Sequence, residues 1–160
     1  MKRSFHIAEG QCWHFGNVVA PGQYGDHFLP LRITNNLDLL SDLKFERQTL
    51  LEGIDNPDLD VLPPHFKTEA GGVVIRLKWK PQQLDDVRIV IVDKDNNPLT
   101  HTDREMQDAF FKVSFYQTAW EYKGKCGTKL IPRKIQLQSL ATLADVFNED
   151  ATPTPVSGDF

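Results

Sequence analysis

The chain has 160 residues, a quarter of them charged, and a net charge of -4 at pH 7. This length predicts one domain whose core is large enough to fold without disulfides or a structural metal. No apolar stretch is long enough to span a bilayer, and the basic N-terminus lacks the apolar segment of a secretory signal. Because there are only two cysteines, we expect a reducing, cytoplasmic setting.

The N-terminal half predicts short strands and loops around one ambiguous segment. Residues 11–34 place glycines and prolines between apolar pieces, a pattern typical of short strands joined by turns. Leucines recur between Leu37 and Leu51 at imperfect helical spacing, so a short helix and an irregular acidic segment both remain open. Residues 52–71 are rich in Pro, Asp and Gly and predict a loop.

The clearest predicted strand is Gly72–Lys80. Its apolar and basic residues alternate with period two, so one face is apolar and the other is basic. The apolar face carries Val73, Ile75, Leu77 and Trp79, and the opposite face carries Val74, Arg76, Lys78 and Lys80. The next run, Val87–Val92, is almost continuously β-branched and predicts a central strand covered on both sides.

The C-terminal half predicts a helix and a strand pair. Asp103–Asp108 predicts a short helix, and Phe111–Tyr122 predicts a long strand. Lys123–Gly127 reads as a basic hairpin turn, and Thr128–Gln138 as a last strand that Pro132 places at a sheet edge. These elements predict a mainly β fold with one or two short helices.

The charge distribution favours a nucleic-acid partner despite the acidic total. Residues 71–138 contain twelve Lys or Arg and eight Asp or Glu, whereas the remaining residues contain six and fourteen. An acidic protein can therefore present a basic face, which is the electrostatic feature that phosphates require.

Alternation along the predicted strands concentrates cations and aromatic rings on one surface. Binding a single strand without sequence preference requires cations for the phosphates and flat rings for the bases. The alternative is that the aromatic residues form a second core face or a dimer contact. The predicted nucleic-acid-binding residues are Arg76, Lys78, Lys80, Lys112, Tyr116, Trp120, Tyr122, Lys123, Lys125, Lys129, Arg133 and Lys134.

The last residues predict a flexible acidic tail. From Asp145 onward the chain has no Lys or Arg and ends in an aromatic residue. Such a peptide can dock in a basic, apolar pocket of a partner protein or occupy the chain's own cationic groove. The alternative is a disordered end without a function. The residues predicted to contact a partner are Glu149, Asp150, Asp159 and Phe160.

No residue pattern predicts a metal, a cofactor or a catalytic site. Cys12 and His14 share a strand face, but a zinc site needs three or four ligands. Asp93, Asp95 and Asp103 suggest a hydrolytic metal site, or else turn and capping residues around Asn96-Asn97-Pro98. Phosphate loops, dinucleotide fingerprints and nucleophile elbows are absent.

Two segments resemble a family of phage-encoded single-stranded DNA-binding proteins. The segments are VIVDKDNNPLTHTD (residues 90–103) and AWEYKGKCGTKLIPRKIQL (residues 119–137). The positions that match the family's pattern are Asp93, Asp95, Pro98, Leu99, Gly124, Lys125, Gly127, Ile135 and Gln136. The resemblance implies an OB fold, here an OB-like five-stranded barrel, and an acidic tail that ends in Phe.

We therefore expect an OB-like domain over residues 1–144 and a flexible acidic tail over residues 145–160. The expected function is sequence-nonspecific binding of single-stranded DNA during replication or recombination in a bacterial host cytoplasm, without catalysis or cofactor. The tail would contact replication or recombination proteins, and a homodimer is possible. The alternatives are a structural or inhibitory interaction module, which could bind a host factor through residues 38–60, and a metal-dependent nuclease.

Overall fold

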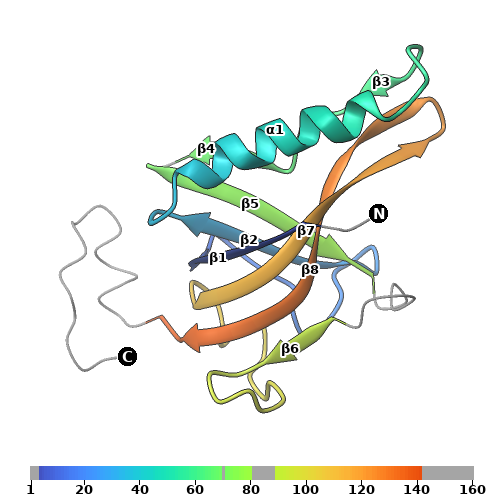
Figure 1. Ribbon diagram of the computed structural model, residues 1–160. Coiled ribbons are helices and arrows are strands. Elements are labelled where there is room, and N and C mark those ends of the chain that lie inside the picture. The colour runs from blue at the N-terminus through green and yellow to red at the C-terminus, as the bar shows by residue number, and fades with distance from the viewer. Residues whose placement is uncertain (1–3, 70, 81–88, 142–160) are drawn as a thin grey trace.

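The computed structural model describes residues 4–69, 71–80 and 89–141 (Figure 1). The mainly β prediction is confirmed. Among the described residues no helix is both long and apolar enough to cross a membrane. The elements in chain order are β1 (Phe5–Cys12), β2 (His27–Ile33), α1 (Asp38–Glu52), β3 (Asp60–Val61), β4 (Phe66–Glu69), β5 (Gly72–Trp79), β6 (Val90–Val92), β7 (Phe110–Tyr122) and β8 (Lys125–Ser139).

Five strands close into a ring. β1 pairs with β2 and β7, β2 pairs with β5, and β7 pairs with β8, all antiparallel. The ring closes where β5 meets β8 in parallel at Leu77 and Leu130. Gly10 permits a close crossing in this ring, because a Cβ there would lie 2.5 Å from the carbonyl oxygen of Arg32 on β2. The predicted OB-like fold is therefore confirmed as a ring of five strands.

The core fills the ring, and α1 covers one end of it. Leu29, Leu77 and Phe115 are among the fully buried side chains that point inward. The helix adds Leu39 and Leu43 to the same core, so the helical alternative for the leucine-rich segment is confirmed. Burying a large apolar side chain contributes roughly 1.5–3 kcal/mol, which is enough to hold a helix with an imperfect apolar stripe.

A polar network also fastens α1 to the sheet. The buried Gln117 amide on β7 donates to the Leu43 carbonyl oxygen at 3.1 Å and to the Glu46 carboxylate at 3.0 Å. The same carboxylate contacts the His6 ring on β1 at 3.0 Å. This network, together with the leucines, holds α1 against β1 and β7.

The loop predicted for residues 52–71 is only partly correct. β3 pairs in parallel with β8 at Lys125 and Cys126, and β4 pairs antiparallel with β5. Pro63 and Pro64 separate these two short strands, so the segment reads as a loop from composition. As a result β5 has two partners along one edge: β4 at its start and β8 further on.

The prediction that Pro132 places the last strand at an edge is wrong. β8 pairs with β7 over its whole length and also with β3, β5 and β6. The register slips between Ser114 and Phe115 on β7, and Pro132 lies opposite this irregularity. It also falls between Leu130, which pairs with β5, and Lys134, which pairs with β6. A residue without an N–H is tolerated where the ladder is already interrupted.

The central strand predicted at Val87–Val92 is also wrong for its described part. β6 covers only Val90–Val92 and pairs with β8, and Val90 is 42% exposed. Residues 87 and 88 lie outside the described residues. Composition alone cannot distinguish a short outer strand from a central one, because both consist of β-branched residues.

The short helix predicted at Asp103–Asp108 is instead a series of turns. Thr102 and Glu105 do form the reciprocal hydrogen bonds of a helix start, with distances of 3.0–3.2 Å. The segment stops at Asp108, whose φ of 60° is incompatible with a right-handed helix. The capping hydrogen bonds of a helix N-terminus are therefore present, but the segment ends before the following residues can form a helix.

Candidate nucleic-acid interface

The outer side of β2 and β5 carries cations beside an aromatic ring. Alternation along β5 exposes Arg76 and Lys78, as predicted. Arg32 on β2 places its guanidinium 4.8 Å from the ring centre of Trp13, which directly follows β1. Lys78 forms a 3.3 Å ion pair with Asp26, just before β2. We call Trp13, Arg32, Arg76 and Lys78 the β2–β5 face.

The β2–β5 face continues onto the far half of the β7–β8 hairpin, which is the half next to the turn (residues 118–129). Because Leu77 pairs with Leu130 in parallel register, Lys129 lies opposite Arg76 on the same side of the sheet. Further along the hairpin, Trp120 pairs with Gly127 and is partly exposed. A Cβ at Gly127 would lie 3.1 Å from the indole, so the glycine provides the space in which the ring lies flat on the strand.

The tip of this hairpin is a two-residue turn. Lys123 and Gly124 both have positive φ, 47° and 78°, as a type I′ turn requires. The predicted basic turn is confirmed at Lys123 and Gly124, but Lys125–Gly127, which were predicted to belong to it, form the start of β8. Tyr122 is 65% exposed, and the Lys123 ammonium lies 5.2 Å from its ring centre. Lys125 pairs with Tyr122 across the turn, so the tip presents two cations beside one ring.

The near half of the hairpin, which lies away from the turn (residues 110–117 and 130–139), carries the other predicted residues. Lys112 contacts Glu9 on β1 at 3.9 Å, and Lys134 donates to Asn96 at 3.0 Å. The Arg133 guanidinium lies 4.8 Å from the ring centre of Phe5 on β1. These cations face β1 and β6 and are engaged with local partners, so the structure does not join them to the β2–β5 face.

Tyr116 is not available for stacking on a base. It is on the predicted side of β7, but only 6% of it is exposed, because Phe5 on the neighbouring β1 covers it edge-on at 5.8 Å. For this residue the alternative of a second core face is correct.

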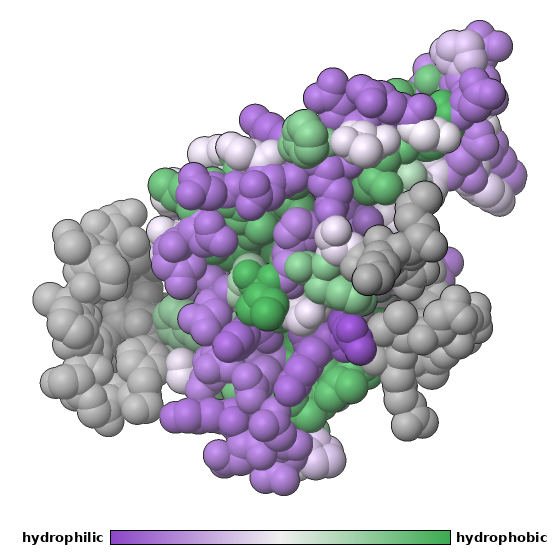
Figure 2. Space-filling view, in the orientation of Figure 1, coloured by the Kyte–Doolittle hydropathy of each residue, from purple (hydrophilic) through white to green (hydrophobic). Residues whose placement is uncertain are grey.

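Figure 2 shows that hydrophilic residues dominate the surface in this view and that apolar residues appear as smaller patches between them.

Positive charge is concentrated where β4 and β8 diverge along β5. His65 lies at this point, and its carbonyl oxygen accepts a 2.8 Å hydrogen bond from the Arg76 N–H. Burial, and then the charges of Lys78, Arg76 and Arg47, lower the pKa of His65. The cations of β5 and Arg47 of α1 therefore act on the same imidazole.

The loop between β1 and β2 adds aromatic residues that the sequence reading missed. Phe15 is 50% exposed and Tyr24 is 86% exposed. The Asp103 carboxylate accepts hydrogen bonds from the backbone N–H groups of Val18, Val19 and Ala20 at 2.7–3.0 Å. The number of aromatic residues in this segment could have indicated a binding loop. Its many Gly and Pro residues instead led to a prediction of short strands and turns.

Two of the three carboxylates considered for a metal site, those of Asp93 and Asp103, accept hydrogen bonds from the backbone. Asp93 accepts from the N–H groups of Asp95 and Asn97, both at 2.9 Å, and Asp103 holds the β1–β2 loop. In the described segments, no group of three His, Cys, Asp or Glu residues is arranged to hold a metal ion. Burial raises the pKa of the Cys12 thiol to about 12, and it stays protonated at neutral pH.

Known structures share this fold at low sequence identity. The structure of gp2.5, a single-stranded DNA-binding protein encoded by bacteriophage T7, superposes with a TM-score of 0.66 over 96% of this chain and 97% of that one, at 14% identity. The single-stranded DNA-binding protein of bacteriophage Enc34 in complex with single-stranded DNA superposes with a TM-score of 0.60 over 86% and 88%, at 11% identity. No family model and no curated protein matches the chain.

The predicted acidic tail lies outside the described residues. This holds for Glu149, Asp150, Asp159 and Phe160, so the flexibility of the tail and its partner stay predictions.

Lys80, another predicted binding residue, directly follows β5 and is exposed beyond the cations of the β2–β5 face.

Proposed function

We propose that the chain binds single-stranded DNA through the β2–β5 face and the far half of the β7–β8 hairpin. The observation that carries the proposal is the Arg32–Trp13 stack beside Arg76 and Lys78. OB folds bind oligonucleotides on their second and third ring strands and on the two flanking loops. In this chain those strands are β2 and β5, and those loops are the β1–β2 connection and the β7–β8 turn.

Each component of the face has a separate role. Four cations, Arg32, Arg76, Lys78 and Lys129, neutralise phosphates. The flat surfaces of Trp13 and Trp120 stack on bases. A stacked base contributes roughly 1–3 kcal/mol whatever its identity, so the binding is tolerant of sequence. Because the bases are engaged, the bound strand is shielded from nucleases and from re-pairing.

A titration of fluorescent oligo-dT tests the proposal. The double variant Arg76→Ala/Lys78→Ala should reduce the slope of log K against log salt by about 1.4, which is about 0.7 for each lost phosphate contact. Lys94→Ala is the matched control, because Lys94 is exposed in the turn after β6. An equal change in both variants would place the DNA elsewhere.

We further propose a role in replication or recombination, with the tail as the contact for other proteins. The acidic composition of the tail supports this, because a negative segment that moves away lets an acidic protein hold DNA. Removal of residues 145–160 should leave the affinity for single strands equal or higher. A marked loss would mean that the tail supports the binding face. A homodimer stays a prediction, to be checked by sedimentation.

The nuclease alternative is weakened by the hydrogen bonding of the carboxylates. Asp103 uses both oxygens on backbone N–H groups of the β1–β2 loop. Incubating labelled single strands with and without EDTA decides the matter: degradation that EDTA abolishes would establish the enzyme. The alternative of an inhibitory module requires that the chain has no affinity for single strands, and the same titration measures this.

A further inference from the structure

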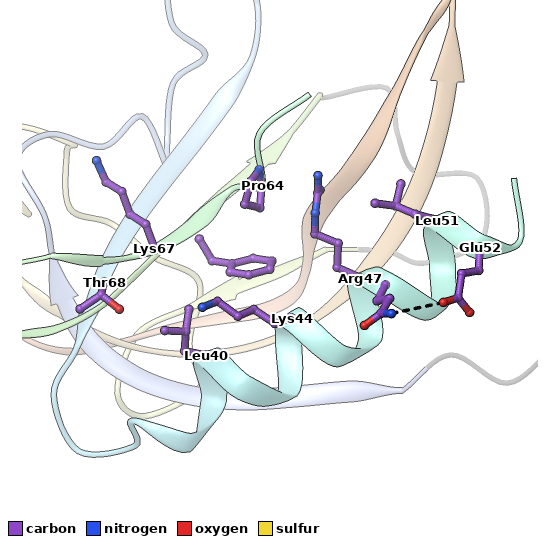
Figure 3. A pocket seen from close by; sticks show the side chains of 10 residues that line it. Leu40, Lys44, Arg47, Leu51, Glu52, Pro64, Lys67 and Thr68 are labelled. Atoms are coloured by element: carbon purple, nitrogen blue, oxygen red, sulfur yellow. Dashed lines mark hydrogen bonds between the residues drawn. The ribbon is translucent and has the colours of Figure 1, made fainter. Parts of the chain in front are cut away.

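A pocket of about 640 Å³ lies between α1 and the open edge of β4 (Figure 3). Its floor is apolar and includes Leu40, Pro64 and Phe66. Pockets of roughly 300–1,000 Å³ typically receive small ligands or single groups of larger ones. A nucleobase with its sugar fits within this volume, and the half-buried Leu40 and the exposed Pro64 are suitable apolar surfaces for it to lie against, whereas Phe66 is buried beneath them.

Cations surround the mouth of the pocket. Lys44 and Arg47 reach it from α1 and Lys67 from β4 (Figure 3). Among the described residues, neither Lys44 nor Arg47 forms an ion pair with a carboxylate. Lys67 forms a 3.5 Å ion pair with the half-exposed Glu69, a surface contact of little strength.

Arg47 is held in place by the protein. Its guanidinium donates to the Thr128 hydroxyl at 2.8 Å and to the Leu62 carbonyl oxygen at 2.7 Å. Both partners are neutral, so the positive charge remains available, and little side-chain entropy is lost when an anion approaches.

The pocket is continuous with the β2–β5 face. Lys67, at the pocket mouth, pairs in register with Val74 on β5, two residues before Arg76. His65 lies in the chain between Pro64 and Phe66 of the pocket, and its carbonyl oxygen accepts a 2.8 Å hydrogen bond from the Arg76 N–H. A phosphate chain leaving Arg76 toward β4 therefore meets Lys67 and then the mouth of the pocket.

We propose that this pocket receives one nucleotide of a bound single strand, with its base against Leu40 and Pro64 and its phosphates near Lys44 and Lys67. The inference rests on the proposed function and extends it by a second contact region beyond the ring. It implies that longer strands gain affinity and salt dependence that strands confined to the β2–β5 face do not have.

The polar wall of the pocket favours a base over an acidic peptide. Glu52 places a carboxylate at the wall, 3.4 Å from the Gln48 amide. A carboxylate repels an acidic peptide, whereas carboxylate, amide and hydroxyl groups hydrogen-bond the edges of bases. Thr68 adds such a hydroxyl on β4.

A length series of oligo-dT, from about 4 to 16 nucleotides, tests the proposal with the full chain. For the longest strands, Lys44→Ala/Lys67→Ala should lower the slope of log K against log salt by about 1.4, and the shortest strands should show no change. Thr68→Trp, which fills the pocket from a strand position, should weaken only the long strands, by about fivefold or more. Lys94→Ala is again the control.

The outcomes separate this inference from the proposed function. If every oligonucleotide binds the pocket variants as it binds the wild type, the pocket inference is overturned and the β2–β5 face stands. If the wild type binds no single strand, both fail. If the variants bind all strands normally but lose binding of a synthetic peptide of residues 142–160, the pocket is a peptide site and the inference is wrong. Thermal melting of each variant confirms that it is folded.

Discussion

Trp120 and Tyr116 lie on the same side of β7, yet the structure predicts opposite consequences for their replacement. Trp120 is partly exposed and rests on Gly127, so Trp120→Ala removes a stacking surface and little core. We expect the binding free energy for oligo-dT to weaken by roughly 1–3 kcal/mol, or about 5- to 150-fold in Kd, with a nearly unchanged melting temperature.

Tyr116→Ala should instead lower the stability. The side chain is 6% exposed, and it packs against Phe5. Truncating a large buried aromatic residue costs about 3 kcal/mol or more, which for a chain of this size lowers the melting temperature by roughly 6–12 °C.

Differential scanning calorimetry and fluorescence titration of both variants provide the assay. At a temperature where Tyr116→Ala is still folded, it should bind oligo-dT within about twofold of the wild type, which is less than the loss of one stacked base. A folded Tyr116→Ala protein with normal melting and weak binding would refute this account of the surface. An unfolded Trp120→Ala protein would place Trp120 in the core.

Three further predictions follow from the same contacts. Asp103→Ala leaves three backbone N–H groups of the β1–β2 loop without their acceptor, so oligo-dT affinity should fall and amide hydrogen exchange at residues 18–20 should accelerate. Because burial raises the pKa of Cys12 to about 12, its thiol should resist iodoacetamide at pH 8 until the protein unfolds, which mass spectrometry measures. A Cys12 modified as quickly as a free thiol would contradict its burial. The pKa of His65 is lowered by burial and nearby cations, so its contribution to stability is present above its ordinary pKa and is lost as the pH falls through the folded value. DNA phosphates offset those cations, so binding near pH 6 should take up protons, detectable by calorimetry in two buffers, and His65→Gln should abolish the uptake.

Local periodicity predicted the parts of the site that lie within one strand. The alternation in Gly72–Lys80 assigned Arg76 and Lys78 to the outer face, and the residue types of Lys123–Gly127 predicted a turn, which the structure narrows to Lys123 and Gly124. These features depend on neighbours in sequence, which is the information that a pattern contains.

The features that the sequence missed depend on pairing between distant segments. Trp13 and Arg32 meet only because β1 and β2 pair near Gln11, a register that no local pattern specifies. Tyr116 was placed on the correct side of β7, but alternation does not reveal that Phe5 on another strand covers it. Pro132 indicated an edge because no local pattern reveals the register shift beside it, where Arg133 on β8 is skipped in the pairing with β7.

The most direct test of the central claim compares labelled oligo-dT with the matching duplex at 50 and 200 mM salt. Four cations on phosphates, namely Arg32, Arg76, Lys78 and Lys129, predict that single-strand affinity falls by about fiftyfold over this range, from a slope of about 0.7 for each contact. The account also predicts tighter binding of the single strand than of the duplex at both salt concentrations, because only unpaired bases can stack on Trp13 and Trp120. Equal or tighter binding of the duplex would contradict it.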